Sequence, residues 1–78
     1  MSGTLADLKV GESATITALQ SLNVAPATRE RLLEMGFVEG MKVELKYEAP
    51  GGDPMAVSVR GGLIALRRKE AEMIEVTK

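Results

Sequence analysis

The sequence predicts a mostly β domain with one helix, arranged as a small, partly open β-barrel of about five strands. The 78 residues leave room for a single domain, spanning 1–78. Apolar and charged residues alternate along 41–49, and shorter alternating segments follow, separated by glycine and proline. Only 26–36 has the spacing of an amphipathic helix. Short strands, tight turns and a single helix in so small a chain are typical of such a barrel.

The first half of the chain is expected to contain one strand and the helix. Residues 14–19 predict the strand, with Ile16 in the core. Pro26 suits the first position of a helix, because an N–H there would have no partner, and Gly36 suits the helix stop. This helix is amphipathic and should pack on the sheet. The residues that share one of its faces are Thr28, Leu32 and Met35.

The second half predicts the remaining strands. Along 41–49 the Lys and Glu side chains should be exposed and five others buried: Met41, Val43, Leu45, Tyr47 and Ala49. The later elements follow in order: a loop at 50–54, a strand at 55–59, a strand at 63–66, a helical turn at 67–72 and a last strand at 73–76. We expect the hairpin between the middle two strands to turn at Gly61-Gly62.

The run 31–43 is the most informative part of the chain. Gly36 ends the helix in the left-handed backbone region, and Gly40 then turns the chain into the next strand. This pattern is a structural device and carries no chemistry of its own. Phe37 and Val38, between the two glycines, either cap the end of the barrel or form an exposed apolar patch for a protein contact.

The composition argues against several classes of function. The sequence contains no cysteine and no histidine, so thiolate chemistry and the commonest general base are absent, and we expect no enzymatic activity. A net charge of −1 argues against nucleic acid binding. No apolar run approaches the length of a membrane span, and the N-terminal residues lack the apolar stretch of a signal peptide. We therefore expect a cytoplasmic protein.

Two charged clusters could bind a ligand or a partner. Glu30 and Glu34 stand about one helical turn apart, a spacing typical of a solvated helix face or, alternatively, of two ligands to a ferrous or manganous ion. The one basic run is Arg67-Arg68-Lys69. It is either a solvated surface, a contact for a partner protein or a contact for nucleic acid. We expect no cofactor, with weak binding of Fe²⁺ or another divalent ion as the alternative.

Three segments of the sequence resemble the FeoA family, the small cytosolic component of the bacterial ferrous iron transport system. They are 31–40, the turn 49–54, and 62–67 with its continuation through 70–76. Together they cover most of the chain in the order that the family shows. In one departure, Glu39 stands where the family often has proline, which puts the rigidity of this turn in question.

The resemblance implies an SH3-like β-barrel that acts with FeoB, the membrane iron permease with a cytosolic G-protein region. We expect a non-enzymatic regulator or adaptor of ferrous iron uptake that docks on this permease and reaches the membrane only through it. The alternatives are a metal-responsive module of the diphtheria-toxin-repressor type and a small nucleic-acid-binding barrel. The hypothesis is one docking surface built from 26–36, 37–40 and 50–54. The expected contact residues are Arg31, Met35, Phe37, Val38, Glu39, Pro50, Asp53, Pro54, Arg67 and Arg68.

Overall fold

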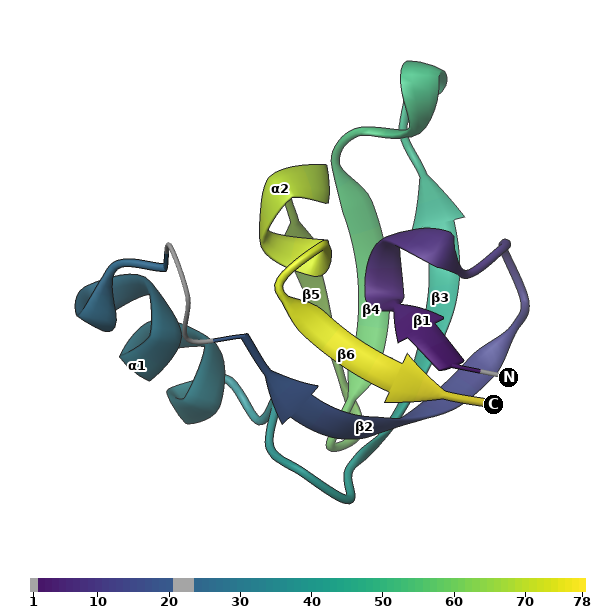
Figure 1. Ribbon diagram of the computed structural model, residues 1–78. Coiled ribbons are helices and arrows are strands. Elements are labelled where there is room, and N and C mark those ends of the chain that lie inside the picture. Colours follow the sequence, from purple (N-terminus) through teal and green to yellow (C-terminus); the bar gives the residue numbers. More distant parts are fainter. Residues whose placement is uncertain (1, 21–23) are drawn as a thin grey trace.

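The structure is a computed structural model that describes residues 2–20 and 24–78. One antiparallel sheet makes up most of the fold, and one main helix lies beside it, which confirms the predicted class (Figure 1). The strands are β1 (Ser2–Thr4), β2 (Ser13–Leu19), β3 (Lys42–Glu48), β4 (Met55–Val59), β5 (Gly62–Leu66) and β6 (Ile74–Thr77). The helices are α1 (Pro26–Glu34) and α2 (Arg68–Ala71), with short 3₁₀ turns η1 (Leu5–Asp7) and η2 (Pro50–Gly52).

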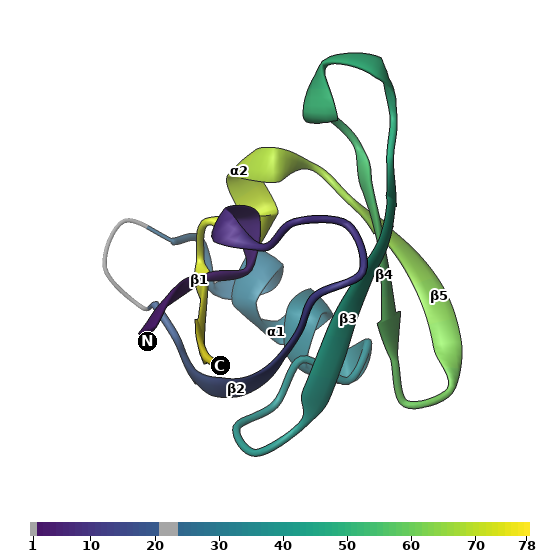
Figure 2. The ribbon, with the colours of Figure 1, turned by 90° about the vertical axis from the view of Figure 1, so that its right-hand side faces the viewer.

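The sheet has the strand order β1-β6-β2-β3-β4-β5, so β1 and β5 form its two edges. In the described part of the chain no ladder joins these edges, and "barrel" is apt only in the loose sense of a curved, open sheet. The described residues form six strands where about five were expected, because β1 is too short to show alternation in the sequence. Its pairing with β6 brings the two ends of the chain side by side (Figures 1 and 2).

Aliphatic side chains and the single phenylalanine fill the core. Ile16 and Leu32 are buried as predicted, and Thr28 and Met35 are half-buried beside Leu32. The side chains that face inward from the sheet and the helices form one continuous cluster: Leu5, Leu8, Ala14, Ile16, Leu32, Phe37, Val43, Leu45, Met55, Val57, Val59, Leu66, Ala71, Ile74 and Val76. The core therefore joins both halves of the chain.

One prediction for the central strand is wrong. Val43 and Leu45 are buried as expected, but the side chain of Tyr47 is 62% exposed. The register between β3 and β4 shifts between Leu45 and Tyr47, so an extra residue stands in β3 at this point. Because side chains alternate between the faces of a strand, such a bulge moves every later residue to the opposite face. Tyr47 therefore lies on the outer face, opposite Ala56.

The hairpin between β4 and β5 turns one residue earlier than predicted. Val59 pairs with Gly62, so the two loop residues are Arg60 and Gly61, with φ of 53° and 79°. Positive φ at both central residues is what a type I′ turn requires, and this turn matches the twist of the flanking strands. Gly62 is consequently the first residue of β5.

The end of α1 is a Schellman motif centred on Gly36. The Gly36 N–H donates to the Leu33 carbonyl at 3.0 Å, and the Phe37 N–H donates to the Leu32 carbonyl at 3.0 Å. Gly36 has φ of 108°, as the motif demands of its central residue. In this motif the residue after the glycine packs against the helix residue whose carbonyl it binds. Phe37 and Leu32 are accordingly both buried in the core.

A second constraint at Gly36 comes from the β4–β5 turn. A Cβ atom built on Gly36 would lie 2.3 Å from Cδ of Arg60, whose aliphatic stem covers the glycine. Gly40 also has a positive φ, of 89°, but a Cβ there would meet nothing within 4 Å. The two glycines of the 31–43 run therefore differ: Gly36 is needed for both its conformation and its space, and Gly40 for its conformation only.

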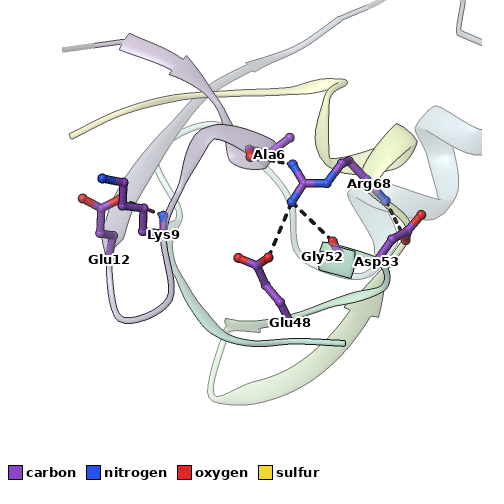
Figure 3. Close-up of polar contacts among 7 residues, drawn as sticks. All are labelled: Ala6, Lys9, Glu12, Glu48, Gly52, Asp53 and Arg68. Carbon is purple, nitrogen blue, oxygen red and sulfur yellow. Dashed lines mark hydrogen bonds and ion pairs between the residues drawn. The ribbon is translucent and has the colours of Figure 1, made fainter. Parts of the chain in front are cut away.

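The Glu12 carboxylate fastens the start of β2 to the end of the chain. Lys78 donates from Nζ to Oε2 at 2.8 Å, and the backbone N–H of Lys9 donates to Oε1 at 2.7 Å (the Lys9 contact is drawn in Figure 3). Both hydrogen bonds favour the ionised carboxylate, that from Lys78 most strongly, so the pKa of Glu12 lies below its ordinary value of 4.5.

Replacing Gly36 by alanine should destabilise the fold more than the same change at Gly40. Both substitutions place a Cβ at positive φ, at roughly 1–2 kcal/mol, but only Gly36→Ala also displaces Arg60. We expect an additional loss of about 1 kcal/mol in the free energy of unfolding, measured by urea denaturation. In an Arg60→Ala background this difference should nearly vanish. Equal losses for the two alanine variants would contradict the packing of Arg60 on Gly36.

The contact of Glu12 should give a measurable pH dependence of stability. Because the pKa of Glu12 is lowered in the folded state, its stabilisation is complete above the unfolded pKa and is lost as the pH falls through the folded pKa. The stability advantage of the wild type over Glu12→Gln should therefore be present at neutral pH and shrink as the pH falls below the ordinary carboxylate value of 4.5. Urea unfolding across this range measures it, with Glu72→Gln, an exposed carboxylate after α2, as control. An advantage that persists at the acid end would refute the assignment.

Candidate functional site

The structure separates the predicted contact residues into two groups at opposite ends of β3. The turn 37–40 precedes this strand and the loop 50–54 follows it (Figures 1 and 2). A strand of seven residues spans roughly 20 Å, so the turn and the loop do not meet. The single docking surface expected from 26–36, 37–40 and 50–54 is therefore not formed.

At the loop end of β3, Arg68 acts as an internal clip. Its guanidinium donates from Nη1 to the Ala6 carbonyl at 2.9 Å and from Nη2 to the Gly52 carbonyl at 3.3 Å (Figure 3). The same Nη2 lies 3.7 Å from Oε2 of Glu48. The Arg68 backbone N–H donates to Oδ1 of Asp53 at 3.1 Å. One residue of α2 thus ties η1, β3 and the 50–54 loop together, and two predicted partner contacts, Arg68 and Asp53, are engaged within the fold.

The other predicted residues near this loop differ in exposure. Pro50 lies exposed in η2, whereas Pro54 is half-buried immediately before β4. The side chain of Arg67 is exposed, and its backbone N–H donates to Oε1 of Glu70 at 2.9 Å, which caps α2. Pro50 and Arg67 therefore remain accessible to a partner at this end of the molecule.

At the helical end, the predicted residues are partly used by the core. Phe37 is 0% exposed, so its side chain offers no surface, and its assignment as a partner contact is wrong. The Schellman motif places it inside, as described above. Met35 and Val38 are half-buried. Arg31 forms an ion pair with the Glu70 carboxylate and links α1 to α2, although its side chain stays 53% exposed.

A hollow of about 300 Å³ lies between the end of β2 and α1. Leu19 and Leu33 line it and are half-buried, while Arg29 and Glu39 contribute exposed charges of opposite sign. Its lining residues are Thr17, Ala18, Leu19, Arg29, Leu33 and Glu39. Apolar surface beside charges of both signs suits an amphipathic protein segment better than a small ionic ligand. We therefore take this helix–strand hollow, with α1, as the candidate site.

Of the hollow's residues, the sequence had indicated Glu39 alone. Leu33 carried a usable signal, because it lies beside the core-facing stripe of α1 and so must leave part of its surface exposed. Nothing in the sequence placed Leu19 and Arg29 next to it, because that proximity depends on how α1 packs against the end of β2.

No further observation among the described residues supports metal binding by the two carboxylates proposed as ligands. Glu30 and Glu34 are exposed on α1. In the described residues, no three Asp or Glu side chains come together as a metal site would require. Binding of Fe²⁺ or another divalent ion at this pair stays a prediction. Within the same described segments, no helix is long and apolar enough to cross a membrane.

Removing the Arg68 clip should loosen the 50–54 loop. Arg68→Ala leaves the carbonyls of Ala6 and Gly52 without their donor, and we expect a loss of about 1–3 kcal/mol in the free energy of unfolding. Arg68→Lys should recover only part of this, since an ammonium cannot reproduce the planar fork. Arg67→Ala, at the exposed neighbour, is the control and should be nearly neutral in denaturant unfolding. Equal effects at 67 and 68 would show that the clip does not hold the loop.

Comparison with known proteins finds both sequence relatives and structures of the same fold. Residues 3–78 match the FeoA domain family. The chain is 36% identical over 72 residues to an Fe(2+) transport protein A/Fe(2+) transporter FeoB fusion protein of Porphyromonas gingivalis, a match that covers 92% of this chain and 8% of that protein. A manganese-dependent transcriptional repressor shares the fold alone, with a TM-score of 0.86 over 97% of this chain and 36% of the other, at 14% identity.

Solved FeoA structures agree in both sequence and fold. The FeoA protein of Chlorobium tepidum is 41% identical with a TM-score of 0.83, over 94% of this chain and 67% of that one. The zinc complex of Stenotrophomonas maltophilia FeoA, an SH3 domain protein, is 37% identical with a TM-score of 0.85, over 95% and 88% of the two chains. The predicted SH3-like fold is confirmed, and the chain belongs to the FeoA family of ferrous iron transport components.

Proposed function

We propose that this chain is a non-enzymatic, cytoplasmic regulator or adaptor of ferrous iron uptake that docks on the cytosolic G-protein region of an FeoB-type permease. The observation that supports it best is the relative in which transport protein A and FeoB occupy one chain. Fusion keeps two domains at a high effective concentration relative to each other, which benefits proteins that act together. The chain spans only 8% of that relative, so the permease's own activity belongs to the rest of it.

The helix–strand hollow is the proposed docking site. Leu19 and Leu33, both half-buried, supply partly accessible apolar surface, and Arg29 and Glu39 supply charges beside it. Protein interfaces commonly combine apolar and charged side chains in this way. An amphipathic segment of the permease, with an apolar side chain in the hollow, fits it. In this proposal the chain reaches the membrane only through the permease.

The chemistry of the side chains supports a regulatory role. The sequence has no histidine or cysteine, which commonly serve enzymes as general base and thiol nucleophile. A regulator that acts by binding a partner needs neither group. Ferrous iron is the cargo of the transporter in this proposal, and we assign no resident cofactor to the chain. Weak binding of a divalent ion at Glu30 and Glu34 is compatible with the same role.

Binding to the permease should depend on the hollow. We expect Leu33→Lys to weaken binding to the cytosolic region of an FeoB-type permease by about tenfold or more, because it places a charge on the apolar lining. Calorimetric titration, with and without guanine nucleotide, measures this. Val10→Lys is the matched control, since Val10 is 56% exposed in the turn before β2.

A second variant keeps the test informative if Leu33→Lys does not fold. Glu39 is exposed, so Glu39→Lys should preserve the fold while it changes the charge of the hollow, and it too should weaken binding. Absence of binding by the wild-type chain at high micromolar concentration would contradict direct docking. Equal binding by Leu33→Lys, Glu39→Lys and Val10→Lys would contradict the choice of surface.

A further inference from the structure

The outer edge of β5 is open. β5 stands at the end of the strand order and pairs with β4 alone among the described strands (Figure 2). Hydrogen-bonding direction alternates along an antiparallel strand, and Gly62 directs its groups to Val59 across the turn. Leu63 and Ala65 therefore direct their N–H and C=O groups to the open edge. This edge can accept the backbone of another extended chain.

The edge strand carries none of the usual protection against such pairing. Natural sheets commonly protect their edges with charged residues, proline or bulges. β5 reads Gly-Leu-Ile-Ala-Leu, with neither charge nor proline. The alternating charges lie instead on β3, Lys42 to Glu48, which is paired on both sides.

The outer face beside this edge is also apolar. Leu63 is 56% exposed and Ala65 is exposed. Ala65 pairs with Ala56, and Ala56 with Tyr47, whose side chain is 62% exposed. Tyr47, Ala56 and Ala65 therefore form one cross-strand row that ends at the open edge. Side chains of an added strand would continue this row.

Positive charge flanks β5 at both ends. Arg60 precedes the strand in the turn, Arg67 follows it, and both are exposed. At the Arg60 end, a hollow of about 250 Å³ is lined by Arg60, Lys42 and Ser58 among others. Glu44 lines the same hollow, but it is paired with Lys46 at 3.3 Å. An incoming strand with acidic residues at its ends would therefore meet opposite charge.

We propose that β5 accepts an extended segment of a partner protein as an added strand, a segment with a short apolar or alternating stretch between two acidic residues. Main-chain hydrogen bonds at Leu63 and Ala65 provide the attachment, and Arg60 and Arg67 select the charge of the flanks. The surface shares no residue with the helix–strand hollow, so it stands whether or not the hollow binds a permease.

The same charges disfavour a second copy of the chain as the occupant. In an antiparallel pairing of two β5 strands centred on Ile64, residue 61 of one copy would stand opposite Arg67 of the other, so Arg60 and Arg67 would lie at adjacent positions at each end of the pair. In a parallel, in-register pairing, each Arg67 would lie beside its counterpart. Like charges placed directly opposite each other destabilise strand pairing. The acid-flanked strand of another protein meets no such repulsion.

A pair of synthetic peptides tests the proposal on the full chain. One has five alternating valine and threonine residues between two aspartates, and its control has two lysines in place of the aspartates. Backbone amide NMR on the isotope-labelled protein should show hydrogen-exchange protection of Leu63 and Ala65 with the aspartate peptide. The lysine peptide should bind about tenfold more weakly. The double variant Arg60→Glu/Arg67→Glu should reverse this preference.

A backbone variant separates strand addition from a general charge effect. In Ala65→Pro the lost N–H faces the open edge, so pairing with β4 is kept while the added strand loses a hydrogen bond. We expect this variant to stay folded and to lose most of its affinity for the aspartate peptide. If Ala65→Pro does not fold, the peptide pair and the charge-reversed variant decide the question on their own.

Three results would overturn the proposal. The first is equal binding of the two peptides, and the second is the absence of any change at β5 with millimolar aspartate peptide. The third is protection of Leu63 and Ala65 that rises with protein concentration when no peptide is present, since it would identify a second copy as the occupant.

Discussion

The Schellman motif at Gly36 is the constraint on which the rest of the fold depends. It ends α1, places Phe37 in the core beside Leu32, and starts the turn that leads into β3. A chain of this length buries a small core, so the one phenylalanine is a large share of it. Arg60, from the β4–β5 turn, then covers the glycine and couples the two turns. The position of α1, and with it the helix–strand hollow, follows from this motif.

The side chains of two of the five arginines of the chain form polar contacts within the fold, and this limits where a partner can bind. Arg68 holds η1 and the 50–54 loop, and Arg31 holds α1 to α2 through Glu70. Arg29, Arg60 and Arg67 have exposed side chains, at the hollow and at the two ends of β5. Residues that appear equivalent as surface cations in the sequence thus have different roles, because tertiary contacts alone determine which cations meet an acceptor group within the fold.

Local patterns predicted the fold class, the helix stop at Gly36 and the burial of Ile16 in β2. These features depend on periodicity and on backbone preferences that a few neighbouring residues express. Tyr47 could not be placed, because a bulge depends on the pairing of β3 with β4 and leaves no mark in the alternation. For Phe37 the sequence allows either a cap on the end of the barrel or an exposed contact, and the buried side chain agrees with the first, because a Schellman motif packs the residue after its glycine against the helix.

The candidate site was less predictable than the fold. The turn 37–40 and the loop 50–54 do not form one surface, because the seven residues of β3 separate them. The hollow that the structure does form is lined by the end of β2, by α1 and by Glu39. The end of β2 lies beside α1 and Glu39 only because of tertiary packing. Sequence reasoning finds such a site only when the packing of the helix on the sheet is known.

The central claim is that the chain affects ferrous iron uptake by docking through the helix–strand hollow. Its most direct test is the rate of labelled ferrous iron uptake by cells that express the permease without the chain, with the wild-type chain, or with the Leu33→Lys or Val10→Lys variant. The account predicts that the wild type and Val10→Lys change the rate equally, and that Leu33→Lys leaves it as in cells without the chain. A Leu33→Lys variant that is present at normal levels and acts like the wild type would contradict the account.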